Sequence, residues 1–346
     1  MKTRAYAAMT PGAPFEPYEF SRRKLGPHDV ALDIHYSGIC HSDIHQVREE
    51  WGGSHFPMVP GHEIAGIVTS TGSAVTKFSV GEHIGVGVYI DSCRNCPSCL
   101  AGLGNYCDEG MTGTYNGYER DGKTIAMGGY SNNFVINEDY AVKIPLNLDL
   151  AATAPLMCAG ITLYSPLRFW SAGPGKKVGI IGLGGLGHMG VKFAAAMGAD
   201  VTVFSHSASK KSDALRMGAH HFVDTSIEGF EQPLKNSFDL ILNTVSAEID
   251  VNTYLSTMVL DSHLVFIGLS GKPYPIQAGA LLGKRRSIAG SMIGGTPELQ
   301  EMLDFCGEHD IVSDIELIDP AYIDVAYERA VNSDVKYRFV INASKF

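Results

Sequence analysis

The chain has 346 residues, of which 45% are hydrophobic and 18% are charged, and its formal net charge is −10. This length favours two domains, and this charge excludes the broad basic surface that sequence-independent nucleic-acid binding requires. The N-terminus lacks an apolar segment of signal-peptide length, and no stretch stays apolar for long enough to span a bilayer. We therefore expect a cytoplasmic protein with neither nucleic acid nor membrane as a partner.

The first 150 residues have the pattern of a β domain. Between Val30 and Tyr36 apolar residues alternate with other residues, which is the period of a strand with one buried face. Short glycine-punctuated segments continue this pattern to about Val142. Residues 1–150 are therefore predicted to form a partly open β-barrel or sandwich with long functional loops.

The pattern changes near Pro145, after which strand and helix signals alternate. A helix predicted at 186–197 presents one apolar stripe, because its large apolar residues recur at three- and four-residue steps. The predicted strands are 177–181, 201–204, 222–223, 238–243, 264–267 and 287–289. About six parallel strands with intervening helices predict a doubly wound Rossmann domain over residues 151–294, in an α/β protein.

The last segment, residues 295–346, departs from this alternation. Thr296 and Pro297 are predicted to be the N-cap and the first residue of a helix that ends at Gly307. Residues 337–341 are predicted to be a strand. We expect this segment to return to the first domain and complete it.

Four closely spaced cysteines point to a metal site. Cys93, Cys96, Cys99 and Cys107 form the pattern C-x2-C-x2-C-x7-C, which lets one loop surround a zinc ion with four thiolates. Such a site has no open coordination position, so its predicted role is structural. An iron centre or disulfides are the alternatives, and a reducing compartment favours zinc over both.

A second set of candidate ligands is scattered along the chain. Cys40 lies in GICHSDIH, His62 and Glu63 lie in PGHEIAG, and Cys158 lies in PLMCAG. Two thiolates and one imidazole make a catalytic zinc site whose fourth position is left for water or substrate oxygen. Taken singly, a cysteine or a histidine more often has a structural role than a ligating one, and Cys306 on an apolar helical face is expected to be such a core cysteine.

A glycine-rich loop follows the first strand of the predicted Rossmann domain. In G-L-G-G-L-G, Gly182 makes the turn, Gly184 lets a pyrophosphate approach, and Gly187 allows close packing. Because the loop also opens a helix, it predicts a dinucleotide site.

The residues after the second Rossmann strand indicate which dinucleotide binds. An NAD-binding domain usually places an acidic residue there, whereas this chain has Ser205, followed by Ser207, Lys210 and Lys211. Hydroxyls and cations suit a 2′-phosphate, so NADP(H) is the predicted cofactor. The alternative is that the two lysines only begin a solvated helix.

The stretch G61-H-E-x-x-G66-x5-G72-x-x-V75 resembles the signature of zinc-containing alcohol dehydrogenases. The segments GICHSDIH, EEWGGSHFPMVPGHE and MGGYSN are most similar to the cinnamyl alcohol dehydrogenase branch of that family. The resemblance implies a GroES-like β-barrel catalytic domain beside the Rossmann domain, one catalytic and one structural zinc per chain, and a homodimer joined through the Rossmann sheets.

The resemblance also implies roles for individual residues. Asp43 would orient His62 from its second ring nitrogen, and Glu63 would lie behind the zinc as a second-shell residue or alternate ligand. Ser42 would touch the substrate oxygen, and the proton lost by the alcohol would pass through Ser42 and the nicotinamide ribose hydroxyl to His45, near solvent. The additional residues that the resemblance places against the cofactor are Thr162, Gly185 and Leu186.

These features predict a zinc-dependent NADP(H) alcohol dehydrogenase or aldehyde reductase that acts on primary alcohols, aromatic or medium-chain. Trp51, Thr114 and Tyr115 are expected to shape the substrate pocket. One alternative is a zinc-free quinone or enoyl reductase, which has no use for Cys40, His62 and Cys158 together. The other is a zinc or dinucleotide sensor without turnover, which needs no proton exit through Ser42 and His45.

Overall fold

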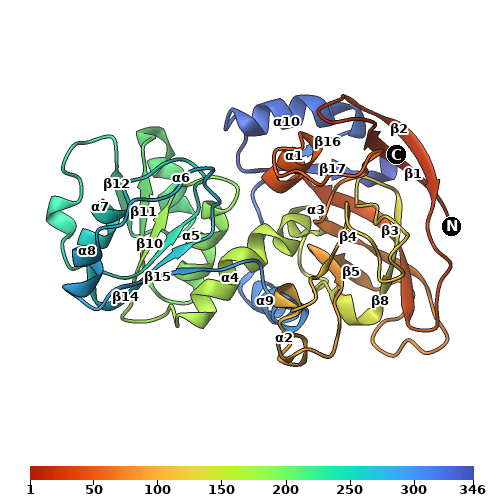
Figure 1. The fold of residues 1–346 in the computed structure, drawn as a ribbon, viewed down its shortest axis with the longest axis horizontal. Coiled ribbons are helices and arrows are strands. Elements are labelled where there is room, and N and C mark those ends of the chain that lie inside the picture. Colours follow the sequence, from red (N-terminus) through yellow and green to blue (C-terminus); the bar gives the residue numbers. More distant parts are fainter. The chain divides into compact units, whose positions relative to one another are not determined.

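The computed structural model describes residues 1–346, which form two compact units (Figure 1). One unit comprises Met1–Ile161 together with Ile293–Phe346, and the other comprises Thr162–Met292. The first break follows Ile161 and not residue 150, because α3 (Leu150–Thr153) and the 3-10 helix Ala154–Met157 pack against strands of the first unit. The segment that contains Cys158 therefore belongs to the first unit.

The first unit is built on a seven-stranded sheet in the order β16-β17-β3-β4-β5-β9, with β8 also paired to β3. Strand β3 is central and runs antiparallel to β4, β8 and β17, which places residues from distant parts of the sequence side by side. Two further pairs, β1 with β2 and β6 with β7, lie outside this sheet. The strands of this unit are β1 (Lys2–Ala8), β2 (Phe15–Ser21), β3 (Asp29–Gly38), β4 (Ile64–Thr71), β5 (His83–Val86), β6 (Tyr89–Asp91), β7 (Thr112–Gly113), β8 (Asn133–Asn137), β9 (Ala141–Lys143), β16 (Ile315–Ile318) and β17 (Arg338–Asn342).

The helices of this unit are short except near the C-terminus. They are α1 (His41–Val47), α2 (Pro97–Leu100), α9 (Thr296–His309) and α10 (Ile323–Val331), besides α3. The predicted ends of α9 were wrong by a few residues. Gly295 and not Thr296 is the N-cap, and the helix continues past Gly307 to Asp310, whose left-handed φ of 52° ends it. Gly307 instead packs against Pro145, to which an added Cβ would come within 3.0 Å.

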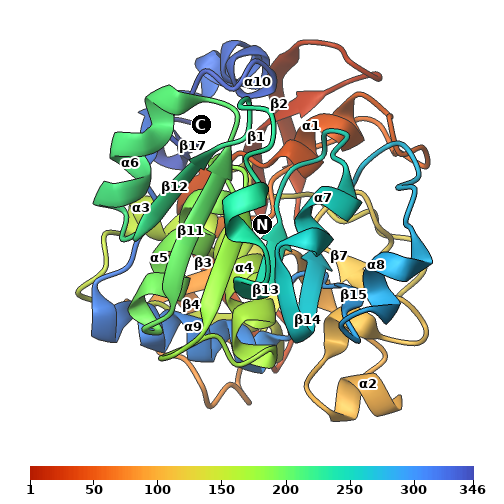
Figure 2. The same cartoon turned by 90° about the vertical axis from the view of Figure 1, so that its left-hand side faces the viewer.

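The second unit has the predicted doubly wound architecture. Its six strands are all parallel, in the order β12-β11-β10-β13-β14-β15 (Figure 2). Every predicted strand is present, and two of them, β10 and β13, have the predicted ends. The strands are β10 (Lys177–Ile181), β11 (Asp200–Ser205), β12 (His221–Asp224), β13 (Phe238–Asn243), β14 (Met258–Phe266) and β15 (Ser287–Gly290). The helices are α4 (Ala159–Phe169), which begins in the first unit, α5 (Gly187–Ala196), α6 (Lys211–Arg216), α7 (Val251–Ser256) and α8 (Ala278–Leu282).

Helix lengths also bear on a possible membrane span. No single helix is long and apolar enough to cross a bilayer. One pair, Leu150–Met157 with Ala159–Phe169, has sufficient combined length and apolar character, but the two parts are bent by 59°.

Candidate active site

The three predicted ligands of the catalytic zinc come from different segments and converge in the first unit. Cys40 is the N-cap of α1, His62 precedes β4, and Cys158 lies between the 3-10 helix Ala154–Met157 and α4. Their ligand atoms and a carboxylate oxygen of Glu63 all lie within 4.8 Å of one another. All four residues are buried, so the cluster is shielded from bulk water.

The chemistry of these donors fits a zinc ion. The Sγ atoms of Cys40 and Cys158 are 4.0 Å apart, and two thiolates in tetrahedral coordination at Zn–S distances of about 2.3 Å would be separated by about 3.8 Å. The Nε2 atom of His62 is buried without a hydrogen-bond partner, which is costly unless something binds it. A hydrogen bond from Cys158 lowers the pKa of Cys40 and raises that of Cys158, as expected for two sulfurs sharing one proton.

Asp43 holds two of these ligands at once. Its Oδ1 atom is 2.9 Å from His62 Nδ1, and its Oδ2 atom accepts a hydrogen bond of 2.9 Å from the backbone N–H of Cys40. Burial lowers the pKa of His62, but the negative charge of Asp43 and its hydrogen bond outweigh burial and raise that pKa well above its usual value. In the neutral ring, the hydrogen bond to Asp43 keeps the proton on Nδ1 and leaves Nε2 as the atom that can ligate a metal.

Glu63 is paired with a residue that the sequence did not single out. The Arg338 side chain at the start of β17 donates to both carboxylate oxygens of Glu63, at 2.6 and 2.7 Å. Burial raises the pKa of Glu63 to about 8, and the positive charge of Arg338 opposes this shift. The only advance signal was an arginine in an otherwise apolar strand, YRFVI. Gly38 leaves the space that Glu63 occupies.

The two residues of the predicted proton path lie on α1. The Oγ atom of Ser42 is 3.6 Å from Cys40 Sγ. His45, one turn later, is partly exposed, shares a hydrogen bond through Nδ1 with the Glu50 carboxylate, and stacks on Trp51 with ring centroids 5.0 Å apart. Trp51, predicted to shape the substrate pocket, is thus found beside His45, whereas no role was predicted for Glu50.

Tyr115, predicted to shape the substrate pocket, lies against the metal cluster. Its ring stacks on His62, with centroids 5.9 Å apart and planes inclined by 20°. Its hydroxyl donates a 3.3 Å hydrogen bond to the Ser42 carbonyl. Thr114 is buried, and its hydroxyl donates a hydrogen bond to the Gly87 carbonyl. Tyr115 thus covers one face of the imidazole.

The four cysteines of the second cluster also converge. The Sγ atoms of Cys93, Cys96, Cys99 and Cys107 lie within 4.8 Å of one another, with 3.8 Å between those of Cys93 and Cys99. Backbone N–H groups of Cys93 and Cys96 donate to sulfurs of this cluster at 3.3 Å. Four sulfurs at tetrahedral spacing fit a closed zinc site, and all seven cysteines of the chain are free of disulfides.

The glycine loop in the second unit has the geometry expected of a phosphate loop. Gly182 has a φ of +91° at the end of β10, and an added Cβ on Gly187 would collide with the Gly182 carbonyl. An added Cβ on Gly184 would meet nothing within 4 Å, so packing does not require glycine there. That open space and the N-terminus of α5, where Leu186 is the N-cap, leave room for a pyrophosphate. Gly185 lies between these two positions.

The predicted 2′-phosphate residues lie at the end of β11. Ser205 is buried there, and its Oγ accepts a 3.2 Å hydrogen bond from the Ser207 N–H. The Lys210 ammonium donates to the Leu183 carbonyl at 2.9 Å, so its charge lies beside the glycine loop. Thr162 is buried in α4 of the same unit.

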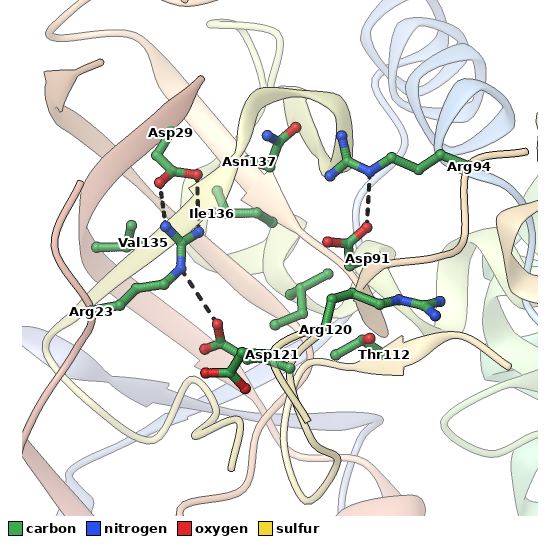
Figure 3. A pocket seen from close by; sticks show the side chains of 12 residues that line it. Arg23, Asp29, Asp91, Arg94, Thr112, Arg120, Asp121, Val135, Ile136 and Asn137 are labelled. Carbon is green, nitrogen blue, oxygen red and sulfur yellow. Dashed lines mark hydrogen bonds and ion pairs between the residues drawn. The ribbon is translucent and has the colours of Figure 1, made fainter. Parts of the chain in front are cut away.

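A pocket of about 250 Å³ in the first unit contains none of these residues (Figure 3). Its charged side chains pair with one another: Arg23 with Asp29, and Arg94 with Asp91. Arg120 donates to the Gly110 carbonyl. Since the protein itself satisfies these charges, the pocket gives no sign of a ligand.

The comparisons with known proteins agree with this geometry. Residues 26–146 match the alcohol dehydrogenase GroES-like domain, and residues 185–308 match the zinc-binding dehydrogenase domain. NADP-dependent alcohol dehydrogenase C 1 of Mycolicibacterium smegmatis is 57% identical over 98% of this chain and 97% of its own length. The chain belongs to the zinc-binding alcohol dehydrogenase family. Within this family, the aldehyde reductase YahK of Escherichia coli is 49% identical, over 99% of this chain and 98% of its own.

Solved structures of the family place the chain near the cinnamyl alcohol dehydrogenases. The Helicobacter pylori enzyme, complexed with NADP(H), aligns with a TM-score of 0.92 and 40% identity over 100% of this chain and 99% of its own. A Sorghum bicolor enzyme aligns with a TM-score of 0.96 and 39% identity over 99% and 98%. The predicted family branch and the GroES-like plus Rossmann architecture are confirmed.

Proposed function

We propose that this chain is a zinc-dependent NADP(H) alcohol dehydrogenase that interconverts primary alcohols, aromatic or medium-chain, with their aldehydes. The observation that carries the proposal is the buried set of Cys40, His62 and Cys158, in which an unpartnered imidazole nitrogen faces two sulfurs. Relatives named NADP-dependent alcohol dehydrogenase and aldehyde reductase support the reaction class.

Each part of the site has a task in this reaction. Zinc bound by the three ligands would supply a Lewis acid that acidifies an alcohol or polarises a carbonyl. Ser42, beside Cys40, holds the substrate oxygen and passes on its proton, and His45 exchanges that proton with solvent. The Glu50 carboxylate shares a hydrogen bond with Nδ1 of His45, so Nε2 is the nitrogen left for proton exchange. NADP(H), when bound, would supply or accept the hydride.

The cofactor proposal is NADP(H) bound to the second unit. The glycine loop and the N-terminus of α5 receive the pyrophosphate, while Ser205, Ser207 and Lys210 receive the 2′-phosphate. The absence of a carboxylate at the end of β11 removes the charge that would repel this phosphate.

The proposed function is tested by metal content and turnover. We expect the purified protein to contain two zinc ions per chain and to oxidise NADPH when given a panel of aromatic and medium-chain aldehydes. Both are measured directly, by elemental analysis and by NADPH absorbance. A protein that binds zinc and NADPH but reduces no aldehyde in the panel would support a sensor instead. A protein that reduces quinones or enones after zinc removal would support a zinc-free reductase.

We also propose the cytoplasm as the compartment of this protein. The chain has two clusters of cysteines without disulfides, and within each cluster the ligand atoms lie within 4.8 Å of one another. Reducing conditions keep such closely spaced thiols available as ligands, because oxidation would join them as disulfides.

We further propose a homodimer joined through the sheet of the second unit. Strand β15 is an edge strand, and unpaired edge strands pair readily with a second copy. Leu269 and Leu282 of the same unit are 68% and 81% exposed. We expect sedimentation to give a dimer that Leu282→Glu weakens. Leu146→Glu, at a residue 79% exposed in the first unit, is the matched control and should leave the dimer intact.

A further inference from the structure

We infer that Tyr130 and Tyr327 are positioning residues, which through their hydroxyls hold Asp43, and thereby His62, in the orientation that the catalytic metal requires. This inference rests on the proposed function, because it concerns the same metal centre. It adds residues from two further segments of the chain, the loop before β8 and helix α10 of the C-terminal segment.

The contacts form a continuous buried chain. The Tyr327 hydroxyl donates to the Tyr130 hydroxyl at 3.2 Å, and the Tyr130 hydroxyl donates to Asp43 Oδ2 at 3.3 Å. Asp43 Oδ1 in turn accepts a hydrogen bond of 2.9 Å from His62 Nδ1. Tyr130 and Asp43 are 0% exposed and Tyr327 is 5% exposed, so bulk water does not compete for these bonds.

The hydrogen bonds of Asp43 explain why a hydroxyl is needed there. Two ionised carboxylate oxygens offer about four acceptor sites. His62 Nδ1 and the Gly61 N–H at 3.2 Å occupy those of Oδ1. The Cys40 N–H at 2.9 Å occupies one site of Oδ2, and the Tyr130 hydroxyl donates to the same oxygen. A buried carboxylate is stable only when its acceptor sites are filled, so Tyr130 contributes to fixing the Asp43 rotamer.

The backbone is shaped to bring Tyr130 to this place. Gly61, next to His62, has a φ of +102°, and an added Cβ there would lie 2.6 Å from the Tyr130 ring. Tyr130 and Tyr327 rings also pack on Phe15 in one apolar cluster. Phenylalanine would fill the same space, so the hydroxyls are not explained by packing. Their one visible task is to connect α10 to the carboxylate behind His62.

The test compares Tyr130→Phe and Tyr327→Phe, which remove one hydroxyl each and keep both rings. The readouts are the visible spectrum of protein with Co²⁺ at the catalytic site and the rate at which a chelator removes that ion. Loss of a partner behind a ligating histidine typically costs 10- to 100-fold in metal affinity, so we expect Tyr130→Phe to lose the ion about tenfold faster and to shift the spectrum. We expect Tyr327→Phe to do the same to a smaller extent, because it acts through Tyr130.

Tyr89→Phe is the control, because Tyr89 is 6% exposed and its hydroxyl accepts from the Thr296 N–H at 2.9 Å, outside this chain of contacts. It should destabilise the fold similarly while leaving the cobalt spectrum and release rate unchanged. A wild-type spectrum and release rate in Tyr130→Phe would overturn the inference and leave the proposed function standing. If Tyr130→Phe does not fold, a wild-type cobalt spectrum and release rate in Tyr327→Phe would overturn the inference. A wild-type protein that takes up no Co²⁺ at Cys40 would overturn both.

Discussion

Cys40→Ala is expected to lower aldehyde reduction by about 10³-fold or more while leaving the Kd for NADPH unchanged. The variant keeps one imidazole and one thiolate, too few ligands for the open zinc site. Lewis-acid activation contributes several kcal/mol to the barrier, and each 1.4 kcal/mol corresponds to about a tenfold change in rate. The measurements are steady-state turnover, NADPH fluorescence and zinc content, which should fall from two ions per chain to one.

Cys306→Ala is the matched control for this substitution. Cys306 is 0% exposed in α9, and burial raises its pKa, as expected for a cysteine that only packs in the core. Its removal costs packing but no ligand, so zinc content and turnover should remain close to those of the wild type. Retained turnover in Cys40→Ala would remove the metal from the proposed mechanism.

The parts of the fold that the sequence predicts well are those with a local cause. Strands β10 and β13 have the predicted ends because each contains a short, mostly apolar run, as expected for central strands of a parallel sheet that are buried on both faces. The prediction for Gly307 was wrong for a non-local reason. A glycine usually marks a helix end, but here it allows α9 to approach Pro145, and the helix continues.

The residues of the candidate site also differ in how far the sequence could predict them. Cys40, His62 and Cys158 could be selected because thiolates and imidazoles in such motifs have few other uses. Arg338 and Tyr130 could not, because arginine and tyrosine are common residues and their contacts depend on how β17 and the loop before β8 fold against the ligands. The sequence therefore indicated Asp43 and Glu63, but Arg338, Tyr130 and Tyr327 became visible only in the structure.

Ser205→Asp is expected to weaken NADPH binding by about 100-fold and to shift preference toward NADH. Two unit charges about 4 Å apart repel by about 4 kcal/mol at an effective dielectric constant of 20, and screening by solvent and Lys210 reduces this to about 3 kcal/mol. A carboxylate there would also accept from the adenosine ribose hydroxyls of NADH. The measurement is kcat/KM with each cofactor.

Ser205→Asn separates charge from shape, because asparagine has nearly the size of aspartate but no charge. Ser205 is buried and its Oγ accepts from the Ser207 N–H, and the asparagine carbonyl can accept the same bond. If repulsion of the 2′-phosphate is the cause, Ser205→Asn retains most of the NADPH affinity that Ser205→Asp loses. Equal losses in both variants would assign the effect to crowding at the end of β11. Charge is the stronger expectation, because the Lys210 ammonium beside the glycine loop already favours an anion at this place.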